Sequence, residues 1–122
     1  MDKLILIVDD ARFARNITKR ALNAGGYSNI IEAATAADAI TVFAENKPDL
    51  TLLDITLPDN SDLTLLTDML AARPDAKIIM VSAIGQELII TDALSIGAVD
   101  FISKPFNEAD FLSIVNNVLT DE

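Results

Sequence analysis

Five short apolar segments alternate along the chain with segments of helical spacing, and no hairpin signal joins one apolar segment to the next. The apolar segments are residues 4–8, 29–34, 50–53, 77–82 and 100–103, and the helical segments are 11–24, 36–46, 62–72, 86–96 and 108–119. Strands that alternate with helices in this way form a parallel sheet covered on both faces, with right-handed crossovers. We therefore predict an α/β fold, a three-layer doubly wound (βα)5 arrangement with a five-stranded parallel sheet.

Local signals mark several of the predicted helix ends. Gly25 and Gly26 end the first helix, and Thr35 is placed to cap the second. Asn107 is placed to cap the last helix in the same way. Helical spacing in the first helix predicts that four residues face the core: Ala14, Ile17, Ala21 and Leu22.

Length and composition exclude several classes of protein. The 122 residues suit one domain, 1–122, and a net charge of −10 lacks the basic footprint that nucleic-acid binding requires. Without cysteine or histidine, the chain has no disulfide, no thiolate or imidazole metal ligand and no imidazole base. The apolar stretches are too short to span a bilayer, and no signal-peptide pattern occurs. We expect a cytoplasmic protein that does not bind membranes.

Polar residues with distinct chemistry follow four of the five predicted strands. Asp9 and Asp10 follow the first strand, Asp54 the third, Ser82 ends the fourth, and Lys104 follows the fifth. In parallel sheets of this type, the ligand site lies at the carboxyl ends of the strands. We therefore expect these side chains to meet at one edge of the sheet.

The three carboxylates indicate a site for a hard cation. Grouping them costs several kcal/mol of repulsion and desolvation unless a positive charge joins them. All-oxygen ligation without histidine or cysteine favours Mg²⁺. Beside Mg²⁺, Asp54 is a candidate nucleophile that accepts a phosphoryl group. The alternatives are that Asp9 and Asp10 cap the first helix and that Asp54 begins a turn.

Ser82 and Lys104 offer complementary groups for a phosphoryl anion. The Ser82 hydroxyl is a hydrogen-bond donor to a phosphoryl oxygen, and the Lys104 ammonium balances the carboxylates before phosphorylation and pairs with phosphate afterwards. A cis bond between Lys104 and Pro105 would direct the ammonium inward. Alternatively, Ser82 only starts a turn and Lys104 is a surface lysine at a helix start.

The order of these strand-end residues along the chain, together with the sequence Lys104-Pro105-Phe106, resembles that of a response-regulator receiver domain. The resemblance extends from Leu4 to about Leu119. The resemblance implies strand order 2-1-3-4-5 and phosphorylation by a histidine kinase. It also implies self-phosphorylation and slow autodephosphorylation rather than conventional enzyme activity. The implied Mg²⁺ ligands and phosphoryl contacts are Asp9, Asp10, Asp54, the backbone carbonyl of Thr56, Ser82 and Lys104.

The resemblance also implies a switch and a partner surface. Phe101 would be the aromatic switch that moves with Ser82 and changes the face formed by the fourth helix, fifth strand and fifth helix. The alternative for Phe101 is a core aromatic residue. Helical geometry cannot bury Leu88, Ile89 and Ile90 together, so we expect exposed apolar surface there that contacts a downstream target.

Two stretches, DDARFAR and SAIGQE, are similar to the chemotaxis subgroup of the family. That subgroup implies a monomer, a target such as the flagellar motor switch, and a dedicated phosphatase. Asp62 stands where the family usually has glycine, which puts kinase docking in question. The resemblance implies that Thr56 and Ile84 occupy positions that tune phosphoryl lifetime in the family, and the bulky side chain of Ile84 predicts slow self-dephosphorylation.

Other readings remain open from the sequence. A Mg²⁺-dependent aspartyl phosphohydrolase would need a second carboxylate two residues after Asp54, where the chain has Thr56. A nucleotide-binding flavodoxin-like protein would need a Gly-, Ser- or Thr-rich loop where the chain has DDARFA. The chain could also be a docking module that works without phosphate, or a receiver cut from a longer, for example transcriptional, regulator.

Overall fold

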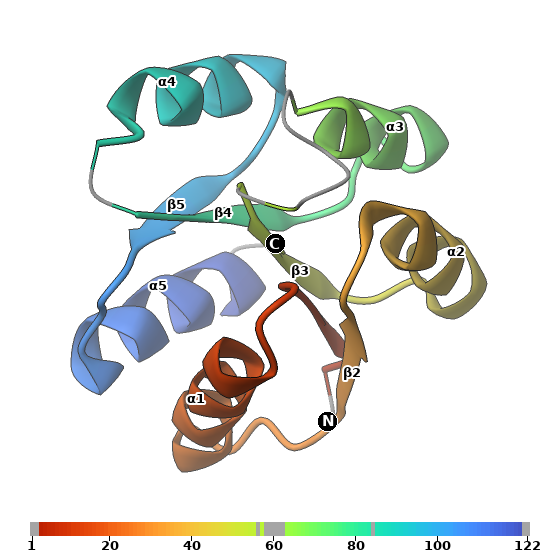
Figure 1. Ribbon diagram of the computed structural model, residues 1–122. Coiled ribbons are helices and arrows are strands. Elements are labelled where there is room, and N and C mark those ends of the chain that lie inside the picture. Colours follow the sequence, from red (N-terminus) through yellow and green to blue (C-terminus); the bar gives the residue numbers. More distant parts are fainter. Residues whose placement is uncertain (1–2, 56, 58–62, 84, 121–122) are drawn as a thin grey trace.

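The computed structural model describes residues 3–55, 57, 63–83 and 85–120, and it confirms the predicted fold class. Five parallel strands form one sheet in the order β2-β1-β3-β4-β5 (Figure 1). The strands are β1 Ile5–Val8, β2 Ile30–Ala33, β3 Leu50–Asp54, β4 Ile78–Ser82 and β5 Asp100–Ser103. The helices are α1 Arg12–Ala24, α2 Ala36–Asn46, α3 Thr64–Ala72, α4 Glu87–Ile96 and α5 Glu108–Thr120.

The helices form two layers, one on each face of the sheet. In Figure 1, α1 and α5 lie together on one side, and α2, α3 and α4 lie on the other. Because successive side chains of a strand point to opposite faces, β1 contributes Ile5 and Ile7 to the core beneath α1 and α5. Leu6 and Val8 join the core beneath α2, α3 and α4. Burial on both faces explains why this strand is apolar at every position.

The two predicted caps are present, and several element boundaries differ from prediction by one or two residues. The Thr35 hydroxyl accepts a hydrogen bond from the Asp38 N–H at 3.1 Å, and the Asn107 side chain accepts one from the Asp110 N–H at 2.7 Å. Strand β2 is shorter at both ends than predicted, and α1 starts one residue later. The described part of the third helix starts at Thr64.

One inward-facing residue of α1 was predicted wrongly. Ala21 and Leu22 are buried, but Ile17 is 40% exposed. The inward position belongs instead to Thr18, which is 7% exposed. Its hydroxyl donates to the Ala14 carbonyl one turn earlier at 3.1 Å, so a polar side chain is tolerated there without an unsatisfied group.

The strand register brings the polar residues to one edge of the sheet. Val8 of β1 pairs with Leu53 of β3, and Asp54 pairs with Val81 of β4. At the next step across the sheet, Ser82 pairs with Ser103 of β5. The residues that end or follow β1, β3, β4 and β5 therefore lie side by side. Among the described helices, none is long and apolar enough to cross a membrane.

Candidate metal centre

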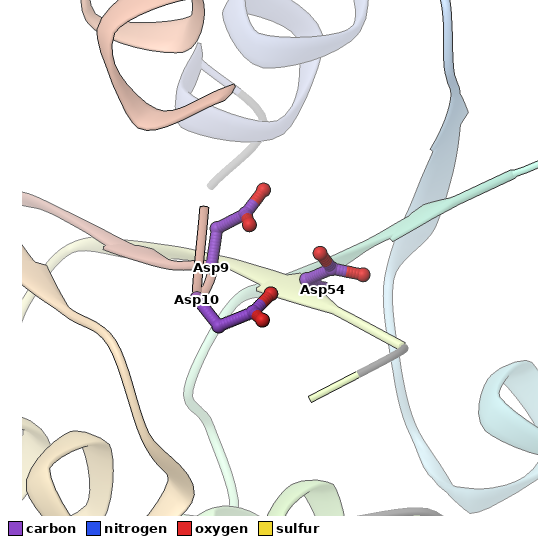
Figure 2. Close-up of side chains that lie close together, drawn as sticks. All are labelled: Asp9, Asp10 and Asp54. Atoms are coloured by element: carbon purple, nitrogen blue, oxygen red, sulfur yellow. The ribbon is translucent and has the colours of Figure 1, made fainter. Parts of the chain in front are cut away.

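Three carboxylates converge at the carboxyl edge of the sheet, as the sequence predicts. Asp9 and Asp10 follow β1, and Asp54 is the last residue of β3 (Figure 2). One oxygen atom from each of the three lies within 4.8 Å of the others. Asp9 and Asp54 are buried, with 4% and 5% of their surface exposed, whereas Asp10 is exposed. The cluster thus has a buried floor and one side open to solvent.

Lys104 is the cation that joins the two buried carboxylates. Its Nζ lies 2.9 Å from Asp9 Oδ2 and 3.2 Å from Asp54 Oδ2, and the peptide bond to Pro105 is cis. Partial burial lowers the pKa of Lys104, but the hydrogen bond to Asp9 and the negative charge of Asp54 together raise it by more than burial lowers it. The pKa therefore ends above its ordinary value. The ammonium remains charged and partly offsets the repulsion between the carboxylates.

Ser82 lies at the same edge with a hydroxyl available for a ligand. Its residue surface is 1% exposed, and its Oγ has no hydrogen-bond partner within the described residues. Its main-chain carbonyl accepts a hydrogen bond from the Lys104 N–H at 2.7 Å, which ties the end of β4 to the residue after β5. A buried hydroxyl without a partner costs free energy, which a bound acceptor at this edge would recover.

The residues of the site fit a divalent cation. Lys104 supplies one positive charge against three clustered carboxylates, so negative charge remains to be balanced. The donors are all oxygen atoms, and the exposed side of the cluster leaves room for water, as Mg²⁺ requires. The predicted carbonyl ligand, Thr56, lies outside the described residues, as do Asp62 and Ile84. The lifetime prediction based on Ile84 therefore stays a prediction.

Phe101 lies on the edge strand β5. Its residue surface is 38% exposed, which excludes the alternative of an ordinary core aromatic. The ring lines a surface cavity of about 340 Å³ between β5 and α5, together with Pro105, Phe106 and Ile114. An aromatic ring at an open cavity has space to change its orientation.

The candidate partner surface on α4 is smaller than predicted. Leu88 is 83% exposed and Ile89 is partly buried, but Ile90 is only 9% exposed and packs in the core. The helical repeat places Ile90 on the same face as buried Ala93, which turns Leu88 outward. The exposed apolar surface of α4 therefore includes Leu88 but not Ile90.

Two residues that hold the site in place, Arg15 and Glu32, were not identified from the sequence. Arg15 of α1 donates a hydrogen bond from Nη1 to the main-chain carbonyl of Asp9 at 2.6 Å. Its Nε donates to Oε1 of Glu32 at 2.8 Å. The available signal was Glu32 itself, since it is the only charged residue in the strand sequence IIEA.

Comparison with known proteins places this geometry in a family. The sequence matches the family Response regulator receiver domain over residues 5–116. The chain belongs to the response regulator receiver domain family. Receiver domains are switches of two-component signalling, which implies a kinase as phosphodonor and a downstream target, and they typically bind Mg²⁺ at an acidic pocket.

Its relatives include single-domain regulators of similar length. The chain is 41% identical to chemotaxis protein CheY of Bacillus subtilis, over 94% of this chain and 96% of the relative. It is 37% identical to CheY of Thermotoga maritima, over 97% and 98%. A solved CheY-like receiver domain protein from Methanospirillum hungatei is 34% identical, with a TM-score of 0.91 over 99% of this chain and 96% of that one. This receiver domain is therefore CheY-like in sequence and fold.

Proposed function

We propose that residues 1–122 form one monomeric cytoplasmic receiver domain that is activated by phosphorylation of Asp54 in a chemotaxis pathway. The observation that carries the proposal is the convergence of a buried Asp54, two further aspartates, a shared Lys104 and a Ser82 hydroxyl that has no partner among the described residues. Relatives named chemotaxis protein that match almost end to end support the pathway.

In the proposed reaction, a carboxylate oxygen of Asp54 attacks the phosphorus of a phosphohistidine on the kinase. The new P–O bond forms as the P–N bond breaks, and the departing imidazole keeps the electron pair of that bond. Mg²⁺, held by Asp9, Asp10, Asp54 and the carbonyl of Thr56, would neutralise charge on the transferred group. Lys104, already beside Asp54, pairs with the phosphoryl oxygens as they arrive.

Phosphorylation then biases the conformation of the domain. A phosphoryl group adds close to two negative charges and new hydrogen-bond acceptors beside Ser82. Ser82 moves to donate its hydroxyl to the phosphoryl group, and Phe101 turns inward from its cavity. A shift from mostly inactive to mostly active needs roughly 3–5 kcal/mol of differential interaction, which a desolvated hydroxyl contact and a Lys–phosphate pair can supply. The changed α4–β5–α5 face then selects the target, for which the flagellar motor switch is the candidate, and a dedicated phosphatase resets the domain.

The test is the intact mass of the protein after incubation with acetyl phosphate and Mg²⁺. We expect one added phosphoryl group on the wild type, none on Asp54→Asn, and none when EDTA removes the metal. An adduct that persists on Asp54→Asn would place the phosphate elsewhere. A folded wild type that binds Mg²⁺ but takes no phosphate would contradict the proposal and favour a docking module.

A further inference from the structure

The side chain of Arg15 connects the acidic cluster to the neighbouring strand β2. The Arg15 guanidinium donates hydrogen bonds to the Asp9 carbonyl and to Glu32 Oε1. The Arg15 side chain is only 14% exposed. The other carboxylate oxygen of Glu32 accepts from Lys19 Nζ at 2.9 Å. Glu32 is thus held by two cations of α1, and the guanidinium of Arg15 is held between Glu32 and the main chain of the site.

The carbonyl that Arg15 contacts belongs to the peptide unit between the two adjacent aspartates. The preceding peptide unit is also fixed, because the Asp9 N–H donates to the Ala33 carbonyl at 3.1 Å. The main chain at Asp9 is therefore held by β2 on one side and by Arg15 on the other. Rotation of the Asp9–Asp10 peptide unit would move the two carboxylates relative to each other.

The two carboxylates differ in how they are held. The Asp9 carboxylate accepts hydrogen bonds from the Ala11 N–H at 2.9 Å and from Lys104. The carboxylate of Asp10 is exposed and accepts no hydrogen bond within residues 3–55, 57, 63–83 and 85–120. Figure 2 shows the two side chains leaving the backbone in different directions, with Asp54 beside them. The position of the Asp10 carboxylate thus depends on the backbone that carries it.

We infer that Arg15, oriented by Glu32, is a positioning residue of the Mg²⁺ site. Its hydrogen bond fixes the Asp9–Asp10 peptide unit and so presents the Asp10 carboxylate to the cation in the correct place. Removal of groups that orient metal ligands typically weakens metal affinity about 10–100-fold. The inference rests on the proposed function, because it assumes that the cluster binds Mg²⁺.

The sign of the effect separates positioning from simple electrostatics. Arg15 is a cation near a cation site, so loss of its charge alone would make Mg²⁺ bind more tightly. Loss of its positioning contact would make Mg²⁺ bind more weakly. For Arg15→Gln we expect the dissociation constant of Mg²⁺ to rise about tenfold.

The experiment is calorimetric titration of Mg²⁺ into the wild type, Arg15→Gln, Glu32→Gln and the double variant. Arg20→Gln is the matched control, since Arg20 is an exposed arginine of the same helix and its loss changes the net charge equally. We expect Glu32→Gln to weaken binding in the same direction. The double variant should bind no more weakly than Arg15→Gln alone, because the two residues act as one unit.

Folding and phosphorylation controls make the outcomes distinct. Circular dichroism and urea unfolding without Mg²⁺ establish that each variant is folded. If Arg15→Gln does not fold, Arg15→Lys carries the test, because it keeps the positive charge but loses the guanidinium that contacts both Glu32 and the Asp9 carbonyl. Folded variants that bind Mg²⁺ as tightly as the wild type, or more tightly, would overturn the positioning role of Arg15 but not the proposed function. A wild type that binds no Mg²⁺ would instead overturn the proposed function.

Discussion

Replacement of Lys104 by methionine tests how the site balances its charges. Methionine keeps an apolar stem of similar length but removes the ammonium that lies 2.9 Å from Asp9 and 3.2 Å from Asp54. The two buried carboxylates then face each other without their cation. We expect the metal-free protein to lose stability and to gain affinity for Mg²⁺.

The magnitude follows from the geometry of the cluster. Carboxylate oxygens no more than 4.8 Å apart repel each other by about 3 kcal/mol at an effective dielectric constant of about 20. The Lys104 side chain is 30% exposed, so solvent screens part of its effect, and we expect a loss of about 2 kcal/mol in the free energy of unfolding. Relief of about 1 kcal/mol of this repulsion by Mg²⁺ would tighten its binding about fivefold.

Urea unfolding followed by far-UV circular dichroism measures the stability change, since the chain has no tryptophan to report on unfolding. The titration is run near neutral pH, once in excess EDTA and once in saturating MgCl₂. The difference between wild type and Lys104→Met should be large in EDTA and smaller in MgCl₂. Equal stabilities in EDTA would refute the repulsion argument, and an unchanged Mg²⁺ affinity would show that Lys104 does not compete with the cation.

Three further predictions follow from the structure. Because the pKa of Lys104 is raised above its ordinary value of 10.5, its stabilising contribution is fully present below that pH and is lost as the pH rises through the folded-state pKa. The stability gap between wild type and Lys104→Met in EDTA should therefore narrow in that alkaline range, and a constant gap would contradict it. Replacement of Phe43, a fully buried residue of α2, by alanine should lower the free energy of unfolding by about 3–5 kcal/mol, as urea unfolding would show, whereas a loss below about 1 kcal/mol would contradict its core position. Leu88→Glu should leave acetyl phosphate labelling of Asp54 intact but impair capture of the target by the phosphorylated protein; loss of labelling as well would argue against a separate partner surface.

The site residues at the strand ends could be predicted from the sequence without the tertiary structure. Strand β1, Ile5–Val8, is apolar throughout because both of its faces are buried, so Asp9 and Asp10 had to lie beyond it. The same reasoning places Asp54 at the end of β3 and Lys104 after β5. Parallel strands expose their carboxyl ends at one edge, so the periodicity of the sequence was enough to predict a shared acidic site.

Details that depend on rotation of a helix needed the tertiary structure. Apolar spacing alone placed Ile17 in the core, but the packing of α1 buries Thr18 and leaves Ile17 exposed. In α4, three consecutive apolar residues showed that some surface is exposed, and only packing decided that Leu88 is outside and Ile90 inside. A helix has several apolar arcs of similar width, and the neighbouring elements choose among them.

Contacts between distant residues were the part that sequence reasoning could not reach. The hydrogen bond from Arg15 to the Asp9 carbonyl and its pairing with Glu32 join α1, the β1 loop and β2. The spacing of Arg15 and Glu32 in the sequence does not predict this contact, because every residue has a main-chain carbonyl and none is distinguished by residue type. Local patterns of apolar and polar residues specify the sheet and the residue types at its edge. Tertiary structure decided the orientation of each helix and which side chains hold the acidic cluster in place, since both depend on packing across elements far apart in the chain.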